Sequence, residues 1–544
     1  MKNYSVIPTA IAILLATSTS AIGQERIKYQ PAPTQITTPE NVETRLGTLS
    51  FPTGYPTEDT AQKLSDEMLY LHGIESFTNS IQGVSMWALR KGFAKHGIND
   101  NEFIIFPEMM DSKSLFLTAN ADTYYFWGNI NLKNGPMVVE TPPDTLGIFD
   151  DFWFRYISDF GLPGPDRGMG GKYLLVPPGY DGELPTGVYN VLHSRTYLVT
   201  VLGRAFLEDN SPAKAIKDVE DYLKVYKYVP GGIGTTIANY LEGKASLGPT
   251  VKEPKNLARL VDGTGLEINT IPPNDFGHYV FLDEMVQYNP ASALDAELAG
   301  QFAAIGIVKG KKFDPSAKDK AILERAIEVA NGVARMHGLA AGPRSQMRAY
   351  EDSAWWNMLF AGGYNFTTPP PNILADGSVK QIPTDGAIKL SNRTSFFYTA
   401  TGITPAMCMR LTGIGSQYLL ANVDSKSKPF DGSKTYKLEL PANIPARKFW
   451  SMTLYDNQTR SMLQTDQRWP RAGSQSFPSP AAEQNEDGST TLWFGPEKPV
   501  DVPEGNFLMT DPEKGWFCML RFYFPEKSFF DKSWRPGEVE EAEF

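Results

Sequence analysis

Residues 124–139 read YYFWGNINLKNGPMVV, two runs of aromatic and β-branched residues on either side of Asn134-Gly135-Pro136. Aromatic and β-branched residues favour strands, and the Asn-Gly-Pro step is typical of a turn. The same pattern of short β-favouring runs separated by turn residues extends from about residue 103 to residue 205. Its other short β-favouring runs are 103–106, 153–156 and 173–176. Many short strands separated by Gly and Pro turns predict an antiparallel sandwich or barrel.

Helical patterns flank this β-rich region. Before it, apolar residues recur every three or four positions from Leu64 to Trp87, which predicts one long amphipathic helix that begins near Thr57 and ends near Gly97. After it, helical patterns return from about 211 to 345. The helices expected there begin at Ser211-Pro212, span 279–286 and 294–302, and begin at Ser316.

β patterning resumes after the Pro-rich segment 369–371. The clearest strands expected there are 435–440, 448–455, 490–494 and 517–524. The chain therefore predicts an α+β fold with a long N-terminal helix and two antiparallel β-sandwich or jelly-roll-like modules joined by a helical segment. The expected divisions are a signal peptide (1–23), an extended lead-in (24–55), a helix with the first sandwich (56–205), a helical segment (206–368) and the C-terminal sandwich (369–544).

The first 23 residues have the three-part layout of a secretory signal peptide. Lys2 supplies a positive start, residues 6–16 are apolar, and Ala21-Ile22-Gly23 is a small-residue cleavage pattern. We expect cleavage before Gln24 and a periplasmic or secreted product. The apolar run is shorter than the roughly 20 residues that span a bilayer, so no membrane span is expected.

Charge and cysteine content narrow the function classes. The net charge is −11 and the basic residues are scattered, which disfavours binding to nucleic acid. Cys408 and Cys518 are the two cysteines. They exclude a disulfide-rich scaffold and a site built from cysteines alone, and the sequence leaves open whether they pair.

The β-rich stretches resemble two bacterial families of unknown activity. The run 118–125 (TANADTYY), with Arg155-Tyr156 and 171–179 (GKYLLVPPG), is similar to the core of domain of unknown function 1254. The runs 448–456 (KFWSMTLYD) and 521–525 (RFYFP), with Asn485, Asn506, Trp516 and Trp534, are similar to domain of unknown function 1214. The resemblance spans nearly the whole chain after residue 23. It implies a helix-plus-sandwich module followed by a second sandwich, and it implies no particular reaction.

Familiar catalytic and cofactor motifs are missing. Residues 83–87 (GVSMW) fail the Gly-x-Ser-x-Gly elbow at the last position, and the five histidines are too far apart for a short metal motif. Residues 164–173 (GPDRGMGGKY) have Tyr173 where a phosphate-binding loop needs Ser or Thr, so the glycines are expected to form a turn. We therefore predict no cofactor and no metal site.

One polar constellation stands out in the first module: Asn120, Asp122 and Tyr124, with Arg155 nearby in sequence. Strand alternation would place the first three on one face and Tyr125 on the other. In the functional interpretation, Asp122 and Tyr124 are catalytic residues. Asn120 and Arg155 then bind the ligand, and Arg155 forms an ion pair with Asp122. In the structural interpretation, which carries more weight, Asn120 and Asp122 only shape a turn.

A second polar constellation lies in the C-terminal module and comprises Trp450, Tyr455, Asp456, Asn485 and Asp487. Trp450 and Tyr455 are five residues apart and should point to opposite faces of one strand, so they cannot form one flat sugar platform. Trp450 is expected in the core, and Asp487-Gly488 is expected in a turn.

Three functions stay open. The leading hypothesis is an exported protein that binds a polar ligand, a small molecule or polysaccharide such as a carbohydrate or cell-envelope component. The second is a cofactor-independent hydrolase or lyase that uses Asp122 and Tyr124, and the third is a structural envelope protein. The sequence does not decide whether the chain forms homo-oligomers.

Overall fold

The fold is described from a computed structural model that covers residues 29–542, apart from residues 186, 232–233, 245–246, 248–253, 340–346, 358, 360–362, 368–371, 374–378, 381–383, 385 and 410. The signal peptide expected at residues 1–23 lies outside the described residues. Contacts divide the chain into two units, residues 1–65 and 66–544. In the first unit, the lead-in that was expected to be extended contains a hairpin of β1 (Asn41–Thr44) and β2 (Gly47–Ser50).

The long helix expected from the apolar periodicity is present as α1 (Glu58–Lys95). Acidic Glu58 and Asp59 lie in its first turn, where they complement the helix dipole. Its buried residues between Phe77 and Phe93 belong to one large core cluster with helices α4 (Gly277–Tyr288) and α6 (Ala317–Gly338). The aromatic residues of the helix therefore pack in the core.

The first module is a sandwich of two sheets. The strands of its six-stranded sheet, in spatial order, are β12 (Leu260–Asp262), β3 (Phe103–Ile105), β4 (Tyr124–Asn131), β10 (Leu198–Ala205), β6 (Thr145–Asp151) and β7 (Tyr156–Gly161). The strands of the four-stranded sheet are β11 (Lys224–Lys227), β5 (Met137–Glu140), β8 (Lys172–Val176) and β9 (Asn190–His193). Apolar side chains of both sheets share one core, because alternate residues of each strand face the partner sheet.

The first module runs past the expected boundary at residue 205. Helix α2 (Ala213–Tyr222) packs Ala215 and Val219 into the sandwich core, and β11 and β12 complete the two sheets. Another difference concerns residues 153–156, which were expected to form one strand. Residues 152–155 instead connect β6 to β7, so only Tyr156 is in a strand.

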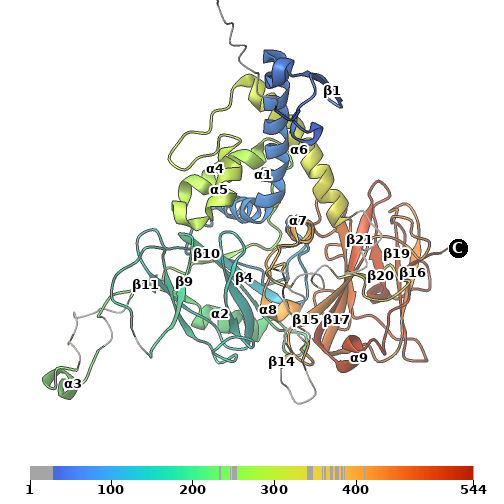
Figure 1. The fold of residues 1–544 in the computed structure, drawn as a ribbon. Coiled ribbons are helices and arrows are strands. Elements are labelled where there is room, and N and C mark those ends of the chain that lie inside the picture. The colour runs from blue at the N-terminus through green and yellow to red at the C-terminus, as the bar shows by residue number, and fades with distance from the viewer. Residues whose placement is uncertain are drawn as a thin grey trace, which may run out of the picture. The chain divides into compact units, whose positions relative to one another are not determined.

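The second module is also a sandwich (Figure 1). One sheet has the order β15 (Ser416–Ala421), β21 (Trp516–Pro525), β17 (Ala446–Asp456) and β18 (Arg471–Gly473). The other has the order β20 (Phe507–Met509), β19 (Thr490–Gly495), β16 (Tyr436–Leu440) and β22 (Glu540–Glu541). All four strands expected in this region are present.

Three of the four sheets in the two sandwiches are mixed, whereas the sheet of β15, β21, β17 and β18 is wholly antiparallel. The pairs β3–β12, β8–β9 and β19–β20 are parallel. Each parallel pair includes a strand of three or four residues at the edge of its sheet, reached by a long connection. Sequence patterning fixes which residues face the core but does not fix the direction of such short edge strands.

The remaining helices of the described chain lie outside the sheets of the two sandwiches. They are α3 (Ile237–Leu241), α4, α5 (Ala296–Ala303), α6, α7 (Leu390–Thr399), α8 (Pro405–Cys408) and α9 (Lys527–Phe530). Figure 1 shows α8 between β4 and β15, with α7 above them. Ser316 caps α6 as expected, because its side chain accepts a hydrogen bond from the backbone N–H of Asp319. No helix in the described part of the chain is long and apolar enough to cross a membrane.

Candidate functional site

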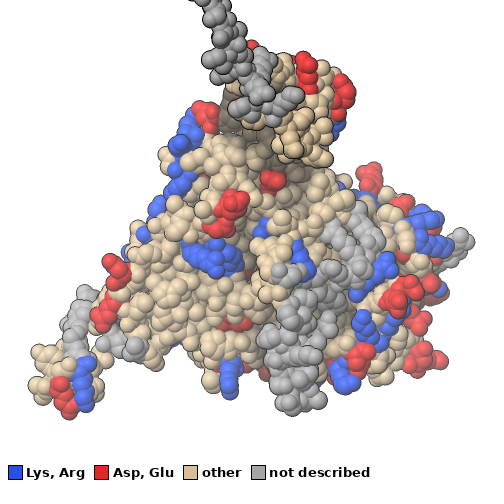
Figure 2. Space-filling view, viewed as in Figure 1, with Lys and Arg blue, Asp and Glu red and all other residues tan. Residues whose placement is uncertain are grey.

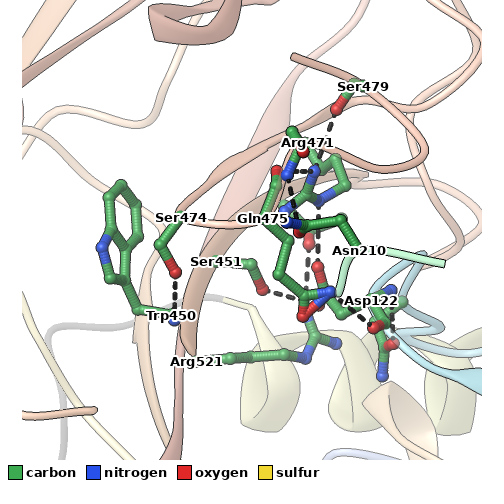
Figure 3. Close-up of polar contacts among 12 residues, drawn as sticks. Asp122, Asn210, Trp450, Ser451, Arg471, Ser474, Gln475, Ser479 and Arg521 are labelled. Carbon is green, nitrogen blue, oxygen red and sulfur yellow. Dashed lines mark hydrogen bonds and ion pairs between the residues drawn. The ribbon is translucent and has the colours of Figure 1, made fainter. Parts of the chain in front are cut away.

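Asp122 lies in a buried ion pair that joins the two modules (Figure 3). Its Oδ1 is 2.9 Å from Arg471 Nε, and both side chains are fully buried. Ser451 Oγ donates a hydrogen bond to Asp122 Oδ2 at 2.6 Å, and Gln475 Nε2 donates to the Asp122 carbonyl at 3.2 Å. All three partners come from the second module.

The expected pair between Asp122 and Arg155 is not formed. Arg155 Nε lies 2.6 Å from Asp151 Oδ2, and Asp151 Oδ1 also accepts the backbone N–H groups of Trp153 and Arg155. Asp151 is four residues away and closes the connection from β6 to β7. Arg155 thus pairs with a local carboxylate through Nε, while its Nη2 has no hydrogen-bond partner among the described residues. The partner of Asp122 comes from a segment about 350 residues later.

The expected alternation of Asn120, Asp122 and Tyr124 does not occur, because residues 118–123 precede β4 and are not in a strand. Asn120 Oδ1 accepts the backbone N–H of Asp122, which confirms the predicted turn, and Asn120 Nδ2 donates to the Tyr125 hydroxyl at 2.7 Å. Tyr124 is fully buried in the core of the first sandwich. Its hydroxyl has no hydrogen-bond partner among the described residues, and burial raises its pKa.

The second constellation is structural. Trp450 packs in the core of the second sandwich, whereas Tyr455 belongs to the cluster on the opposite face of β17, as the spacing predicted. Asp487 accepts hydrogen bonds from the backbone N–H and the hydroxyl of Ser489, in the turn that contains Gly488 at φ +81°. Asp456 and Asn485 also bond to neighbouring turn residues.

A cavity of about 120 Å³ lies at the junction of the two modules. Its walls come from β4, β6, β7 and β10 of the first sandwich, from β15 and β21 of the second, and from α7 and the segment around α8. Among the predicted residues Asn120 lines it, while Asp122, Tyr124 and Arg155 are not among the described lining residues. The lining is apolar for the most part, including Leu146, Ile148, Leu202, Phe396, Met407 and Met519.

Two arginines place positive charge in this cavity. Arg204 on β10 donates from Nη2 to Ser416 Oγ at 3.2 Å, and Arg521 on β21 donates from Nη1 to Thr453 Oγ1 at 3.0 Å and from Nη2 to the Thr118 carbonyl at 2.8 Å. Arg521 is buried and Arg204 is half-buried, and neither has a carboxylate counter-ion among the described residues. Positive charge that is withdrawn from water in this way is costly and attracts an anion.

Tyr418 lies beside both arginines. Its hydroxyl is 2.6 Å from Ser416 Oγ, and the Arg521 guanidinium carbon is 6.0 Å from the centre of its ring. Burial raises the pKa of Tyr418, but the positive charge of Arg204, the hydrogen bond to Ser416 and the charge of Arg521 together lower that pKa below its ordinary value. The neighbouring Tyr523 has no partner for its hydroxyl among the described residues, and burial raises its pKa.

Asp159 is the one acidic residue among the described residues that line the cavity. Burial raises the pKa of Asp159 to about 6, and a hydrogen bond from the Tyr156 hydroxyl to Oδ2, at 2.8 Å, partly offsets that effect. Its Oδ1 is buried and has no hydrogen-bond partner among the described residues. The carboxyl group therefore changes charge just below neutral pH.

No group of three or more His, Cys, Asp or Glu side chains among the described residues is arranged to hold a metal ion. Cys408 and Cys518 are both buried and free, and burial raises the pKa of each thiol. Neither thiol is thus poised as a nucleophile.

The residues that give the cavity its charge were missed by sequence reasoning. Arg204 and Arg521 are single charged residues inside apolar strand runs, VLGRAFL (201–207) and FCMLRFYFP (517–525). A lone arginine in a buried strand is a usable signal, because an unpaired buried charge is costly and is retained for a reason. Nothing in the sequence indicates that these two strands meet at one cavity.

Two family models match the chain. The model described as "Protein of unknown function (DUF1254)" matches residues 101–227, and the one described as "Protein of unknown function (DUF1214)" matches residues 415–527. The chain contains both domains, in this order. The DUF1254 match contains Asp122, Asp159 and Arg204, and the DUF1214 match contains Ser416 and Arg471. The ion pair and the cavity thus lie between the two domains.

Comparison with solved structures gives two similar chains. The crystal structure of the VPA0106 protein from Vibrio parahaemolyticus is 17% identical with a TM-score of 0.47, and the match covers 87% of this chain and 100% of that one. A putative uncharacterized protein from Burkholderia cenocepacia is 11% identical with a TM-score of 0.34, with coverage of 89% and 97%. No curated protein matches this chain.

Proposed function

We propose that this protein binds a small organic anion in the cavity between the DUF1254 and DUF1214 domains. The observation that carries the proposal is Arg204, a cavity-lining guanidinium that hydrogen-bonds to the hydroxyl groups of Ser416 and Tyr418 and has no carboxylate partner among the described residues. A guanidinium has five N–H donors in a planar fork that matches a carboxylate or phosphate. Arg204 therefore has donors to spare for an anionic ligand.

The size and lining of the cavity restrict the ligand further. Its volume of about 120 Å³ is near the roughly 150 Å³ of a protein cavity that holds benzene. Apolar walls beside a few convergent polar groups are typical of small-molecule sites. The proposed ligand is thus a carboxylate or similar anion with a short apolar body, which is a specific form of the polar ligand that the sequence suggested.

Carbohydrate and cell-envelope ligands stay predictions. A whole polysaccharide is larger than this cavity, but one acidic sugar unit or a short acid released from the envelope has the charge that Arg204 would bind. The catalytic roles suggested for Asp122 and Tyr124 also stay predictions, and both side chains have packing or ion-pair partners that account for their burial.

The location of the protein is a separate proposal. The three-part pattern of residues 1–23 supports export, so we propose that the mature protein works in the periplasm or outside the cell, where small acids are available from the medium.

On the face drawn in Figure 2, acidic and basic side chains are interspersed, without a continuous basic surface that would attract nucleic acid.

Calorimetric titration tests the binding proposal. The ligands are butanoate, benzoate, monomethyl succinate, neutral butanamide, and a set of neutral and acidic sugars. We expect a carboxylate to bind, butanamide not to bind, and Arg204→Met to weaken carboxylate binding at least roughly tenfold, as loss of a charged hydrogen bond implies. Arg167→Met is the matched control, because Arg167 is an exposed arginine of the same module outside the cavity lining.

Two results would overturn the proposal. The first is tight binding of a neutral sugar with no carboxylate binding. The second is equal carboxylate affinity in the wild type and in Arg204→Met. If no ligand in the set binds, the structural envelope role suggested by the sequence becomes the better explanation.

A further inference from the structure

Ser416 and Tyr418 form a hydroxyl pair at the proposed anion site. They are two residues apart on β15, so their side chains point to the same face of the strand, and both line the cavity. Their oxygens are 2.6 Å apart, which is a short O–H···O hydrogen bond. Ser416 is thus within hydrogen-bond reach of a potential base and borders a space large enough for a small molecule.

Either hydroxyl can donate in this pair, and the positive charge of Arg204 favours the direction in which Ser416 donates to the Tyr418 oxygen. Arg204 Nη2 donates to Ser416 Oγ at 3.2 Å, and this contact occupies one lone pair of the serine oxygen. The serine hydrogen is then free to point at the Tyr418 oxygen, which accepts it. An accepting tyrosine oxygen between two arginines suits a phenolate, and the lowered pKa of Tyr418 agrees with this arrangement.

We propose that Ser416 is a nucleophile, that Tyr418 is its general base, and that the cavity hydrolyses esters of small dicarboxylic or other anion-bearing acids. The proposal rests on the anion site described above. Nucleophile, base and an orienting third group within hydrogen-bond reach are the pattern of an activated serine. Here the third group is Arg204, which holds the serine oxygen and electrostatically favours the charged form of the base.

The reaction balances with water as the second reactant. The Tyr418 oxygen takes the Ser416 hydroxyl proton while Oγ attacks the ester carbonyl carbon, and a C–O bond forms at the expense of the carbonyl π bond. Collapse breaks the bond to the leaving alcohol, which receives the proton from Tyr418 and leaves an acyl group on Ser416. Water then repeats the sequence, with Tyr418 again moving the proton, and releases the acid. Arg204 and Arg521 line the same cavity, so their positive charge would stabilise the negative charge that develops on the carbonyl oxygen.

Other nucleophiles in the molecule are less suitable. Ser80 is 2.9 Å from His278 Nε2, but both side chains are buried inside the helical cluster and burial lowers the pKa of His278 to about 3. Ser451 donates its hydrogen bond to Asp122, yet neither residue is among the described cavity lining. Of these serines, Ser416 alone is a cavity-lining residue.

The test uses monomethyl succinate, which carries one carboxylate and one methyl ester, and dimethyl succinate, which is neutral. Proton NMR follows release of methanol by the purified full chain. We expect hydrolysis of the monoester in preference to the diester, and succinylated Ser416 in mass spectra of acid-quenched protein. Ser416→Ala and Tyr418→Phe should each lower kcat at least roughly 100-fold, in the range of general-base effects, with little change in KM.

Matched controls separate chemistry from folding. Tyr523→Phe removes a hydroxyl from a tyrosine whose ring also lies near Arg204, at 5.8 Å, but which has no described hydrogen bond to Ser416. It should keep wild-type turnover, and all three variants should keep the wild-type circular dichroism and melting temperature. The wild-type rate should rise with pH as Tyr418 loses its proton, below the ordinary pH range for tyrosine.

The two proposals fail differently. If monomethyl succinate binds to wild-type protein and to Ser416→Ala but no methanol is released, the hydrolase proposal is wrong and the anion site stands. If no carboxylate binds either protein, the anion site is wrong as well. Turnover that persists in Ser416→Ala, or acylation at another residue, also overturns the assignment of Ser416.

Discussion

Replacing Asp122 by Asn removes one charge from the buried pair and leaves the size of the side chain unchanged. Two donors meet the carboxylate in the native protein, Arg471 Nε at 2.9 Å and Ser451 Oγ at 2.6 Å. An amide offers one oxygen, so one donor must face an NH₂ group. The remaining partners of Arg471, Ser479 Oγ at 3.0 Å and the Gln475 carbonyl at 3.3 Å, are neutral.

The expected loss of stability is large because both charges are completely buried. Breaking a buried pair by neutralising one partner costs about 3–5 kcal/mol, since the other charge stays in a low dielectric. Residues 66–544 form one unit. If that unit melts cooperatively, its unfolding entropy is about 1 kcal/mol/K at ~2.1 cal/mol/K per residue, so the melting temperature falls by roughly 3–5 °C.

A double-mutant cycle is the sharper assay, with the free energy of unfolding measured by urea denaturation. Asp122→Asn and Arg471→Met should each destabilise the protein, and the double variant should be markedly more stable than the sum of the two losses implies, because no charge is stranded. Asp221→Asn is the control, since the Lys217–Asp221 pair on α2 is solvent-exposed and should contribute nothing measurable.

The reasoning is refuted if Asp122→Asn costs less than about 1 kcal/mol, the level of an ordinary neutral hydrogen bond. Strict additivity in the cycle would refute it equally. If Asp122→Asn leaves the free energy of unfolding unchanged, the role left for residue 122 is the turn in which its backbone N–H donates to Asn120 Oδ1.

Three further predictions concern other residues. Because burial raises the folded-state pKa of Asp159 to about 6, the folded state binds a proton that the unfolded state releases near pH 4. The free energy of unfolding should therefore fall as pH rises from about 4 to 6, and Asp159→Asn should remove that part of the slope; identical pH profiles would contradict this. Tyr124→Phe deletes a buried hydroxyl without a described partner, so urea midpoints should stay equal or rise, whereas a loss of ligand binding or turnover would instead support the catalytic role suggested by the sequence. N-terminal sequencing of the exported protein should start near Gln24, and a cytosolic chain that begins at Met1 would exclude export.

Local sequence patterns predicted helices and strands well where the spacing of apolar residues and the neighbouring turn residues indicate the same element. The helix that begins at Glu58 and strands β16, β17, β19 and β21 lie where apolar periodicity placed them. The opposite placement of Trp450 and Tyr455 follows from the two-residue period of a strand. There are two exceptions. Residues 152–155 include an aromatic run but form the connection between β6 and β7, in which Asp151 accepts backbone hydrogen bonds. Residues 118–123 form turns with side-chain-to-backbone hydrogen bonds and are not in a strand.

The sequence alone determined the local structure of this protein: the positions of the long helix and the main strands, the turn at Asn120, and the two family resemblances. These depend on interactions within a few residues, which sequence spacing records directly. The tertiary structure decided which side chains pair with one another across the two modules. Asp122 pairs with Arg471 and not with Arg155, and Arg204 meets Ser416 and Tyr418 across more than 200 residues of chain. Such pairs depend on how two sandwiches pack face to face, and any of several buried arginines satisfies the same local pattern. The charge and chemistry of the cavity therefore come from packing rather than from any single motif.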